Sequence, residues 1–160
     1  MNAYDILKYG NNTLMKTLEL VPDTDWEVPS VCGYWSAKDV MAHLASYEAA
    51  LVEILSDQLE KCPTPTLDRF IDPKINFNDD QVGRRKDRTL DEVMTEYKQA
   101  HDHSLTLVKQ IPAQTLHQPG VLAWYGPDYS IDDFLVYTYY GHKREHSAQI
   151  AAFCDSHPKR

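Results

Sequence analysis

The sequence predicts an all-α fold, and more specifically a four-helix bundle. Three observations support this prediction. Four segments place apolar residues three and four positions apart, which is the spacing that puts side chains on one face of a helix. Pro, Gly, Asn and Asp gather between these segments, as they do in loops. Segments with the alternating pattern of a strand are nearly absent.

The composition fits a single water-soluble domain that covers residues 1–160. The chain has 160 residues, of which 42% are hydrophobic and 25% are charged. This length buries enough apolar surface for folding without disulfides or a structural metal, so a bound metal would serve function. The net charge of −8 opposes binding to nucleic acid or to an anionic membrane. With no apolar targeting segment, we expect a cytoplasmic protein.

The first two helices are predicted in the N-terminal third of the chain. The first covers Ala3 to Leu20 and ends before a proline, because the residue that precedes a proline avoids helical backbone angles. The second begins at Ser36, whose hydroxyl can cap the first turn, and ends near Lys61. Its apolar face, which also carries His43, consists of Val40, Leu44, Tyr47, Leu51, Ile54 and Leu55.

The segment from Cys62 to Arg88 shows no convincing helical periodicity. A loop of this length in a compact domain is either functional or a crossover connection. Long crossovers occur in four-helix bundles, so we expect one between the second and third helices.

Capping boxes mark the starts of the last two predicted helices. The third begins where Thr89 and Glu92 form such a box, and a proline closes it after residue 111. The fourth begins at Ser130, which pairs with Asp133, and reaches about Asp155. A single stripe on this helix contains Ile131, Leu135, Thr138, His142, His146, Gln149 and Phe153.

His142 and His146 lie one helical turn apart, so both imidazoles can reach the same ion. His43 lies about 7 residues, or ~10 Å, from the start of its helix, and His146 lies about 9 residues from the end of its own. If these two helices run antiparallel, the three histidines meet at similar height, near one end of the bundle. Three protein ligands with one open position are typical of a catalytic zinc site. The alternative is that these histidines bond to backbone carbonyls or tyrosines in the core.

Two residues near the histidines are candidates for catalysis. Glu145 could support a ligand or act as a base toward bound water, with a solvated or salt-bridged role as the alternative. Tyr47 could line the metal pocket and offer its phenol to a substrate, with a core role as the alternative. We expect Lys143 and Arg144 to be surface or interface charges.

Weaker signals come from three other places. His101 could become a fourth ligand or a proton shuttle, although a structural or surface role is favoured. The basic run from Arg84 to Arg88 is expected to be a solvated loop, with binding of an anionic substrate as the minor alternative. Trp35 is expected to cap the core, and Trp124 either caps the core or forms a wall of the pocket.

Two motifs resemble the DinB superfamily, and most closely the branch labelled DinB or DfsB. They are "YWSAKDVMAHL" from residue 34 to 44 and "GHKREHSAQI" from residue 141 to 150. In that family, a Trp-Ser pair at the start of the second helix is followed by a histidine, and an H-x-x-x-H with a downstream Gln-Ile lies on the last helix. "IDPKINFNDDQV" and "TLDEVMTEYKQA" resemble the crossover and the start of the third helix.

The resemblance implies a DinB-like four-helix bundle that is frequently a homodimer. It also implies a histidine triad of His43, His142 and His146 that binds a divalent metal ion, nickel or zinc first among the options. Characterised relatives include thiol-dependent transferases and isomerases, so a low-molecular-weight thiol is a second expected cofactor.

Two functions from different classes remain open at this point. The first is a metal-dependent enzyme that activates water or a thiol for hydrolysis or thiol transfer on a small-molecule substrate. The second is a noncatalytic, stress-associated bundle that binds a metal or a small molecule. An open coordination position facing a cavity favours the enzyme.

Overall fold

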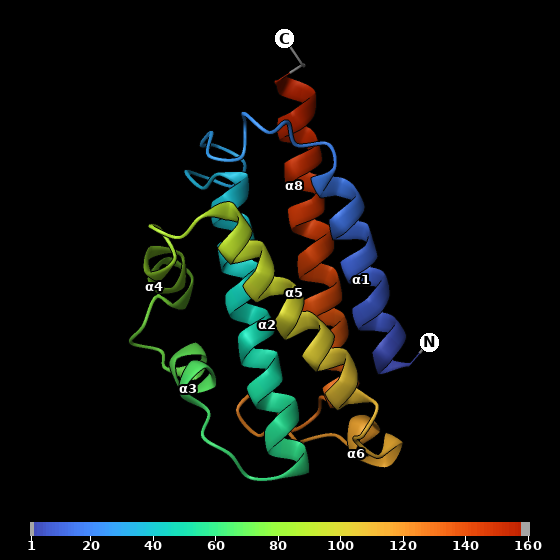
Figure 1. Cartoon of the computed structure of the whole chain (residues 1–160). Coiled ribbons are helices and arrows are strands. Elements are labelled where there is room, and N and C mark those ends of the chain that lie inside the picture. Colours follow the sequence, from blue (N-terminus) through green and yellow to red (C-terminus); the bar gives the residue numbers. More distant parts are fainter. Residues whose placement is uncertain (1, 158–160) are drawn as a thin grey trace.

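The computed structural model describes residues 2–157, and within that range it is helical with no strand. An isolated bridge between Cys32 and Trp35 closes the loop before the second long helix. The prediction of an all-α bundle is confirmed (Figure 1). Its long members are α1 (Ala3–Leu18), α2 (Ala37–Leu59), α5 (Leu90–Val108) and a continuous C-terminal run of α7 (Ile131–Phe134), η1 (Leu135–Gly141) and α8 (His142–Ser156).

The long helices run in two pairs of like direction. In Figure 1, α1 and α8 point upward side by side, whereas α2 and α5 point downward. Because α2 and α5 are parallel, the chain must return from the lower end of α2 to the upper end of α5, which makes a long crossover necessary. Helices α2 and α8 run antiparallel, as they must if the three histidines are to meet at similar height.

The crossover differs from its predicted form, since it contains two short helices, α3 (Pro65–Ile71) and α4 (Phe77–Arg84). A tertiary contact holds α3, and a local cap starts α4. The Glu53 carboxylate of α2 accepts hydrogen bonds from the first backbone N–H groups of α3, and the Asn76 side chain caps α4. Helices of seven or eight residues are too short to show a repeated apolar stripe, so the sequence pattern missed them. A further short helix, α6 (Ala113–His117), follows α5.

Capping residues set the starts of the long helices as predicted. Reciprocal side-chain and backbone hydrogen bonds form capping boxes at Ser36 with Asp39, at Thr89 with Glu92, and at Ser130 with Asp133. The predicted ends were less accurate: α1 ends two residues early, and α5 ends at Val108.

The buried side chains form two hydrophobic clusters that share the same long helices. The upper cluster includes Leu14, Val40, Val93 and Ile150, and the lower one includes Leu7, Leu51, Leu107, Leu135 and Tyr139. Between them, at mid-height, each long helix contributes polar side chains: Asn11, His43, Ser46, Glu48, His101, Ser104, His142, Lys143, His146 and Ser147. We call this set the polar layer. It interrupts the apolar core at the level where α2 faces α8.

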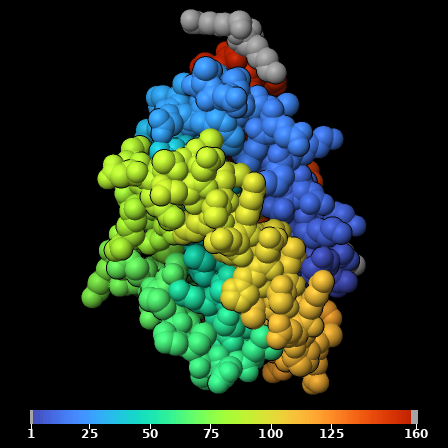
Figure 2. Space-filling model, viewed as in Figure 1, coloured from blue at the N-terminus to red at the C-terminus, as the bar shows by residue number. Residues whose placement is uncertain are grey.

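The surface seen from the front is formed largely by α1, the crossover and α5, which cover most of α8 (Figure 2). The polar layer is therefore shielded on this side by α5. Among the described residues, no helix combines the length and apolar character needed to cross a bilayer.

Candidate metal centre

His43 is fixed on α2 by its neighbours on both sides. The helix starts at the Ser36 cap, and His43 falls two turns later on the face toward α8, with only 2% of its surface exposed. The Trp35 ring lies 5.0 Å from the His43 ring, and the Tyr47 ring lies 4.7 Å away. These contacts between rings hold the imidazole in one orientation.

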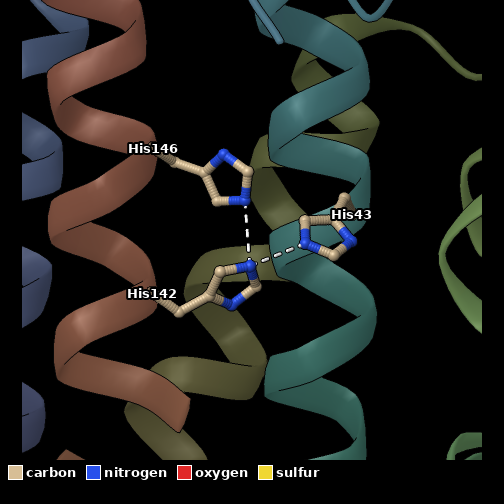
Figure 3. Close-up of side chains that lie close together, drawn as sticks. All are labelled: His43, His142 and His146. Carbon is tan, nitrogen blue, oxygen red and sulfur yellow. Dashed lines mark hydrogen bonds between the residues drawn. The ribbon is translucent and has the colours of Figure 1, made fainter. Parts of the chain in front are cut away.

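The two histidines of α8 meet His43 in the space between the helices (Figure 3). The Nε2 atom of His142 lies 2.9 Å from Nε2 of His43 and 2.9 Å from Nε2 of His146. One possible ligand nitrogen from each residue lies within 4.8 Å of the others. The structure thus brings together the three predicted ligands. They meet at mid-height in the bundle, between the two hydrophobic clusters, and not near one end as expected.

Gln149 orients the third imidazole. Its amide oxygen lies 2.8 Å from Nδ1 of His146, one turn further along α8. When that oxygen accepts the Nδ1 proton, the lone pair of His146 resides on Nε2, the atom that faces the other two histidines. A metal-ligating histidine is commonly held in this way by a hydrogen bond to its second nitrogen.

Burial keeps all three imidazoles neutral near pH 7. Desolvation, with smaller contributions from the other two histidines, lowers the pKa of His43 to about 2. Desolvation, followed by the charges of His146 and Lys143, lowers the pKa of His142 to about 3. The pKa of His146 is also lowered by burial, against an opposing effect of Gln149. Neutral imidazole is the form that ligates a metal ion.

These residues fit a divalent ion with three nitrogen ligands. Three neutral imidazoles that converge on one point in a partly buried layer match the donor set of catalytic zinc sites. Imidazole also suits nickel, copper and iron, so the donor set does not select one metal.

A small pocket opens directly beside His142. Its volume is about 230 Å³, and it is lined by Tyr47, Tyr137, Thr138, Gly141, His142 and Glu145. Both candidate catalytic residues, Tyr47 and Glu145, therefore lie in the same pocket as a candidate ligand. Glu145 is exposed at its rim. The half-buried Tyr47 donates its hydroxyl to Asn78 of α4 at 3.3 Å, and burial raises its pKa.

The π-helical segment η1 shapes this pocket, and the sequence analysis missed it. A π-helix has a wider turn than an α-helix, so it shifts the register of the side chains that follow. The predicted stripe placed Thr138 on the inner face, but the structure buries Tyr139 instead and leaves Thr138 on the pocket wall. Gly141 ends this segment, and a Cβ atom there would lie 3.3 Å from the Val136 carbonyl oxygen. A glycine directly before H-x-x-x-H was the available signal.

The prediction for Lys143 is wrong, because this residue is neither a surface nor an interface charge but lies inside the bundle. Its side chain is 2% exposed and forms an ion pair with Glu48 of α2, which is fully buried. His101 of α5 completes the group, with Nδ1 3.5 Å from the Glu48 carboxylate. Burial raises the pKa of Glu48, but Lys143 and His101 outweigh this effect and bring it below the ordinary value. His101 thus contacts a carboxylate and lies outside the three-histidine cluster.

The two tryptophans differ in their surroundings. Trp35 is buried in the upper cluster and contacts His43, so it both caps the core and borders the metal centre. Trp124 packs on Phe70 and Phe134 and is 36% exposed. It does not line the pocket beside His142.

Comparison with known families agrees with the helical fold. The family model described as mycothiol maleylpyruvate isomerase N-terminal domain matches residues 10–130 of the 160. The chain belongs to this family. The family is part of the DinB/YfiT-like superfamily, so the predicted membership of the DinB superfamily is confirmed. The match includes His43 and ends before His142. No match was found among curated proteins or among solved structures.

Proposed function

We propose that this protein is a metal-dependent enzyme that activates a low-molecular-weight thiol, or water, for attack on a small-molecule substrate. The observation that carries the proposal is the convergence of His43, His142 and His146 beside a pocket that contains two further reactive side chains. A divalent ion held by three imidazoles would lower the pKa of a thiol or water in its remaining position and supply a nucleophile near neutral pH.

The protein side chains have separate tasks in this proposal. His43, His142 and His146 would hold the ion, and Gln149 would keep His146 in the ligating tautomer. The Glu145 carboxylate, exposed at the rim of the pocket, would take the proton from the nucleophile. The Tyr47 hydroxyl, already a hydrogen-bond donor in the fold, would orient or protonate the electrophile.

The name of the family favours the thiol over water. It refers to mycothiol, which is a low-molecular-weight thiol, and to an isomerisation reaction. The pocket volume of about 230 Å³ admits the reacting end of such a thiol together with a small electrophile, but not a macromolecule. Nickel and zinc remain the two metals that the family resemblance implies. A homodimer and a cytoplasmic location also stay predictions, to be tested by light scattering and cell fractionation.

The experiment compares zinc-loaded, nickel-loaded and chelator-treated protein in two assays. Calorimetric titration measures binding of a thiol such as mycothiol, and a second assay measures transfer of that thiol to a set of electrophiles, with maleylpyruvate isomerisation included. The proposal predicts thiol binding and turnover that require the metal. Metal-dependent binding without turnover on any electrophile would favour the alternative, a noncatalytic binding bundle. Turnover that survives removal of the metal would refute the proposal.

A further inference from the structure

Four arginine side chains line one pocket on the crossover, away from the metal centre. The pocket has a volume of about 360 Å³ and lies among α3, α4 and the start of α5. Its lining consists of Pro65, Thr66, Arg69, Gln81, Arg84, Arg85 and Arg88. It shares no residue with the pocket beside His142. The fold thus gathers Arg69 with three arginines from the basic run that was expected to be a solvated loop.

Two carboxylates hold these arginines, and each is shared by two of them. Asp80 accepts two hydrogen bonds from Arg69, at 3.2 and 2.9 Å, and one from Nε of Arg84 at 3.0 Å. Glu96 of α5 is contacted in the same way by Arg85 and Arg88. In these ion pairs four guanidinium groups share two carboxylates, so positive charge exceeds negative charge among the ion-paired groups. This excess stands out on a chain whose net charge is −8. A further carboxylate, Glu53, lies beside the pocket and accepts hydrogen bonds from the backbone N–H groups of Thr66 and Leu67.

A purely structural role accounts for only part of this arrangement. Arg85 is nearly buried and uses its N–H groups on Glu96 and on Gln81, as expected for a structural link between α4 and α5. Arg84 uses only Nε and Arg88 only Nη1 in hydrogen bonds to other described residues. Their side chains are 55% and 41% exposed. Several guanidinium N–H groups at the pocket are therefore fixed in place but remain available to a ligand.

We propose that this pocket binds the phosphate group of a small phosphorylated molecule. Guanidinium groups match the oxygen geometry of phosphate, and charge-assisted hydrogen bonds of this kind are among the strongest in proteins. Phosphate has more acceptor oxygens than a single carboxylate, so it can accept from the unused N–H groups of Arg84 and Arg88 together. The pocket volume is larger than a phosphate ion needs, which favours a phosphate ester over the free ion. Asp80 and Glu96 preorganise the arginines, so little ordering is required on binding.

The test is a titration followed by two-dimensional amide NMR, with inorganic phosphate in one series and glycerol 3-phosphate in the other. Ionic strength is held constant with sodium chloride. The variants are Arg84→Gln and Arg88→Gln, and the matched control is Arg144→Gln, an exposed arginine on α8. Arg84→Gln loses a single hydrogen bond at the end of α4, and Asp80 keeps its contact with Arg69, so the fold is expected to persist. Thermal melts of each variant verify that it is folded.

The proposal predicts saturable shifts at Thr66, Arg69, Gln81 and Arg84, with tighter binding of the ester than of the free ion. Each arginine variant weakens binding by about tenfold, and the control does not change it. Chemical-shift changes that do not saturate, or that are equal in all variants, would overturn the proposal. The arginines would then only hold α3, α4 and α5 together. A third titration series uses an acidic peptide. A response to the peptide alone would also overturn the proposal, since the surface would then dock a protein.

Discussion

Lys143 and Glu48 form an ion pair in the centre of the bundle, and this pair ties α8 to α2 within the polar layer. Lys143 directly follows the candidate ligand His142, and Glu48 lies five residues after His43 on α2. The rings of Tyr97 and Tyr139 flank the ammonium group at 5.7 and 5.9 Å. The two helices that carry the histidines are therefore connected by buried charge next to the site.

Removal of the lysine charge is expected to destabilise the fold strongly. Lys143→Met leaves the Glu48 carboxylate buried without its main counter-charge, which costs about 3–5 kcal/mol of unfolding free energy. Arg144→Met, one position along and exposed, should change this free energy by less than about 0.5 kcal/mol. Urea denaturation of both variants measures the difference.

The double variant Glu48→Leu/Lys143→Met tests the cause of that loss. Because it removes both charges, it should recover most of the stability that Lys143→Met loses. A double variant as unstable as the single one would contradict the ion-pair explanation and would point to lost packing of the lysine stem.

The metal-free protein is expected to lose stability as the pH falls below about 6.5. The pKa of His43 is about 2 in the fold and near 6.5 in the unfolded chain, so the unfolded chain binds more protons between these values. The stability contributed by the neutral imidazole is therefore fully present above pH 6.5 and declines in acid by up to ~1.4 kcal/mol per pH unit. Chelator-treated His43→Leu should show a shallower acid decline between pH 6.5 and 4.5. Parallel curves for the two proteins would be inconsistent with a neutral, buried His43.

Two glycine variants test the π-helical segment. Gly83→Ala in α4 meets no atom within 4 Å, so it should raise the free energy of unfolding by about 0.5–1 kcal/mol, as alanine usually does in a helix. Gly141→Ala places its methyl group 3.3 Å from the Val136 carbonyl oxygen, in the wall of the pocket. Gly141→Ala should therefore not raise the free energy of unfolding. Calorimetric melts of both variants measure the change in unfolding free energy. Equal stabilisation by the two substitutions would show that η1 does not require a glycine.

Substitution of the two pocket residues should separate catalysis from metal binding. Glu145→Gln removes the proposed base and is expected to lower turnover by about a hundredfold or more with unchanged metal content. Tyr47→Phe should act in the same direction through loss of its hydroxyl. Asp155→Asn, an exposed acid on the same helix outside the pocket, is the control. If Glu145→Gln kept full activity, the residue would be a solvated surface charge.

The sequence predicted what local patterns determine. Capping boxes and apolar spacing predicted the starts of α2 and α5, and the H-x-x-x-H spacing predicted the two candidate ligands of α8 that lie next to His43. His43 could be added because helix rise places it at the height of His146 when the helices run antiparallel.

What the sequence could not predict depends on contacts between distant segments. Lys143 occupies a position typical of a surface residue, and only the presence of Glu48 opposite makes its burial possible. The helices α3 and α4 depend on caps and ion pairs rather than on a periodic apolar pattern. The π-helical segment η1 shifts the register within an apolar stripe whose sequence pattern is that of a regular α-helix. The pocket beside His142 depends on that shift.

The central claim is the three-histidine metal centre, and elemental analysis tests it most directly. Protein purified without a metal-affinity tag is compared with His146→Ala, which removes one imidazole from the centre. The account predicts about one divalent ion per chain in the unmodified protein and loss of that ion in the variant. A protein that is free of metal and also takes up neither added nickel nor added zinc would contradict it.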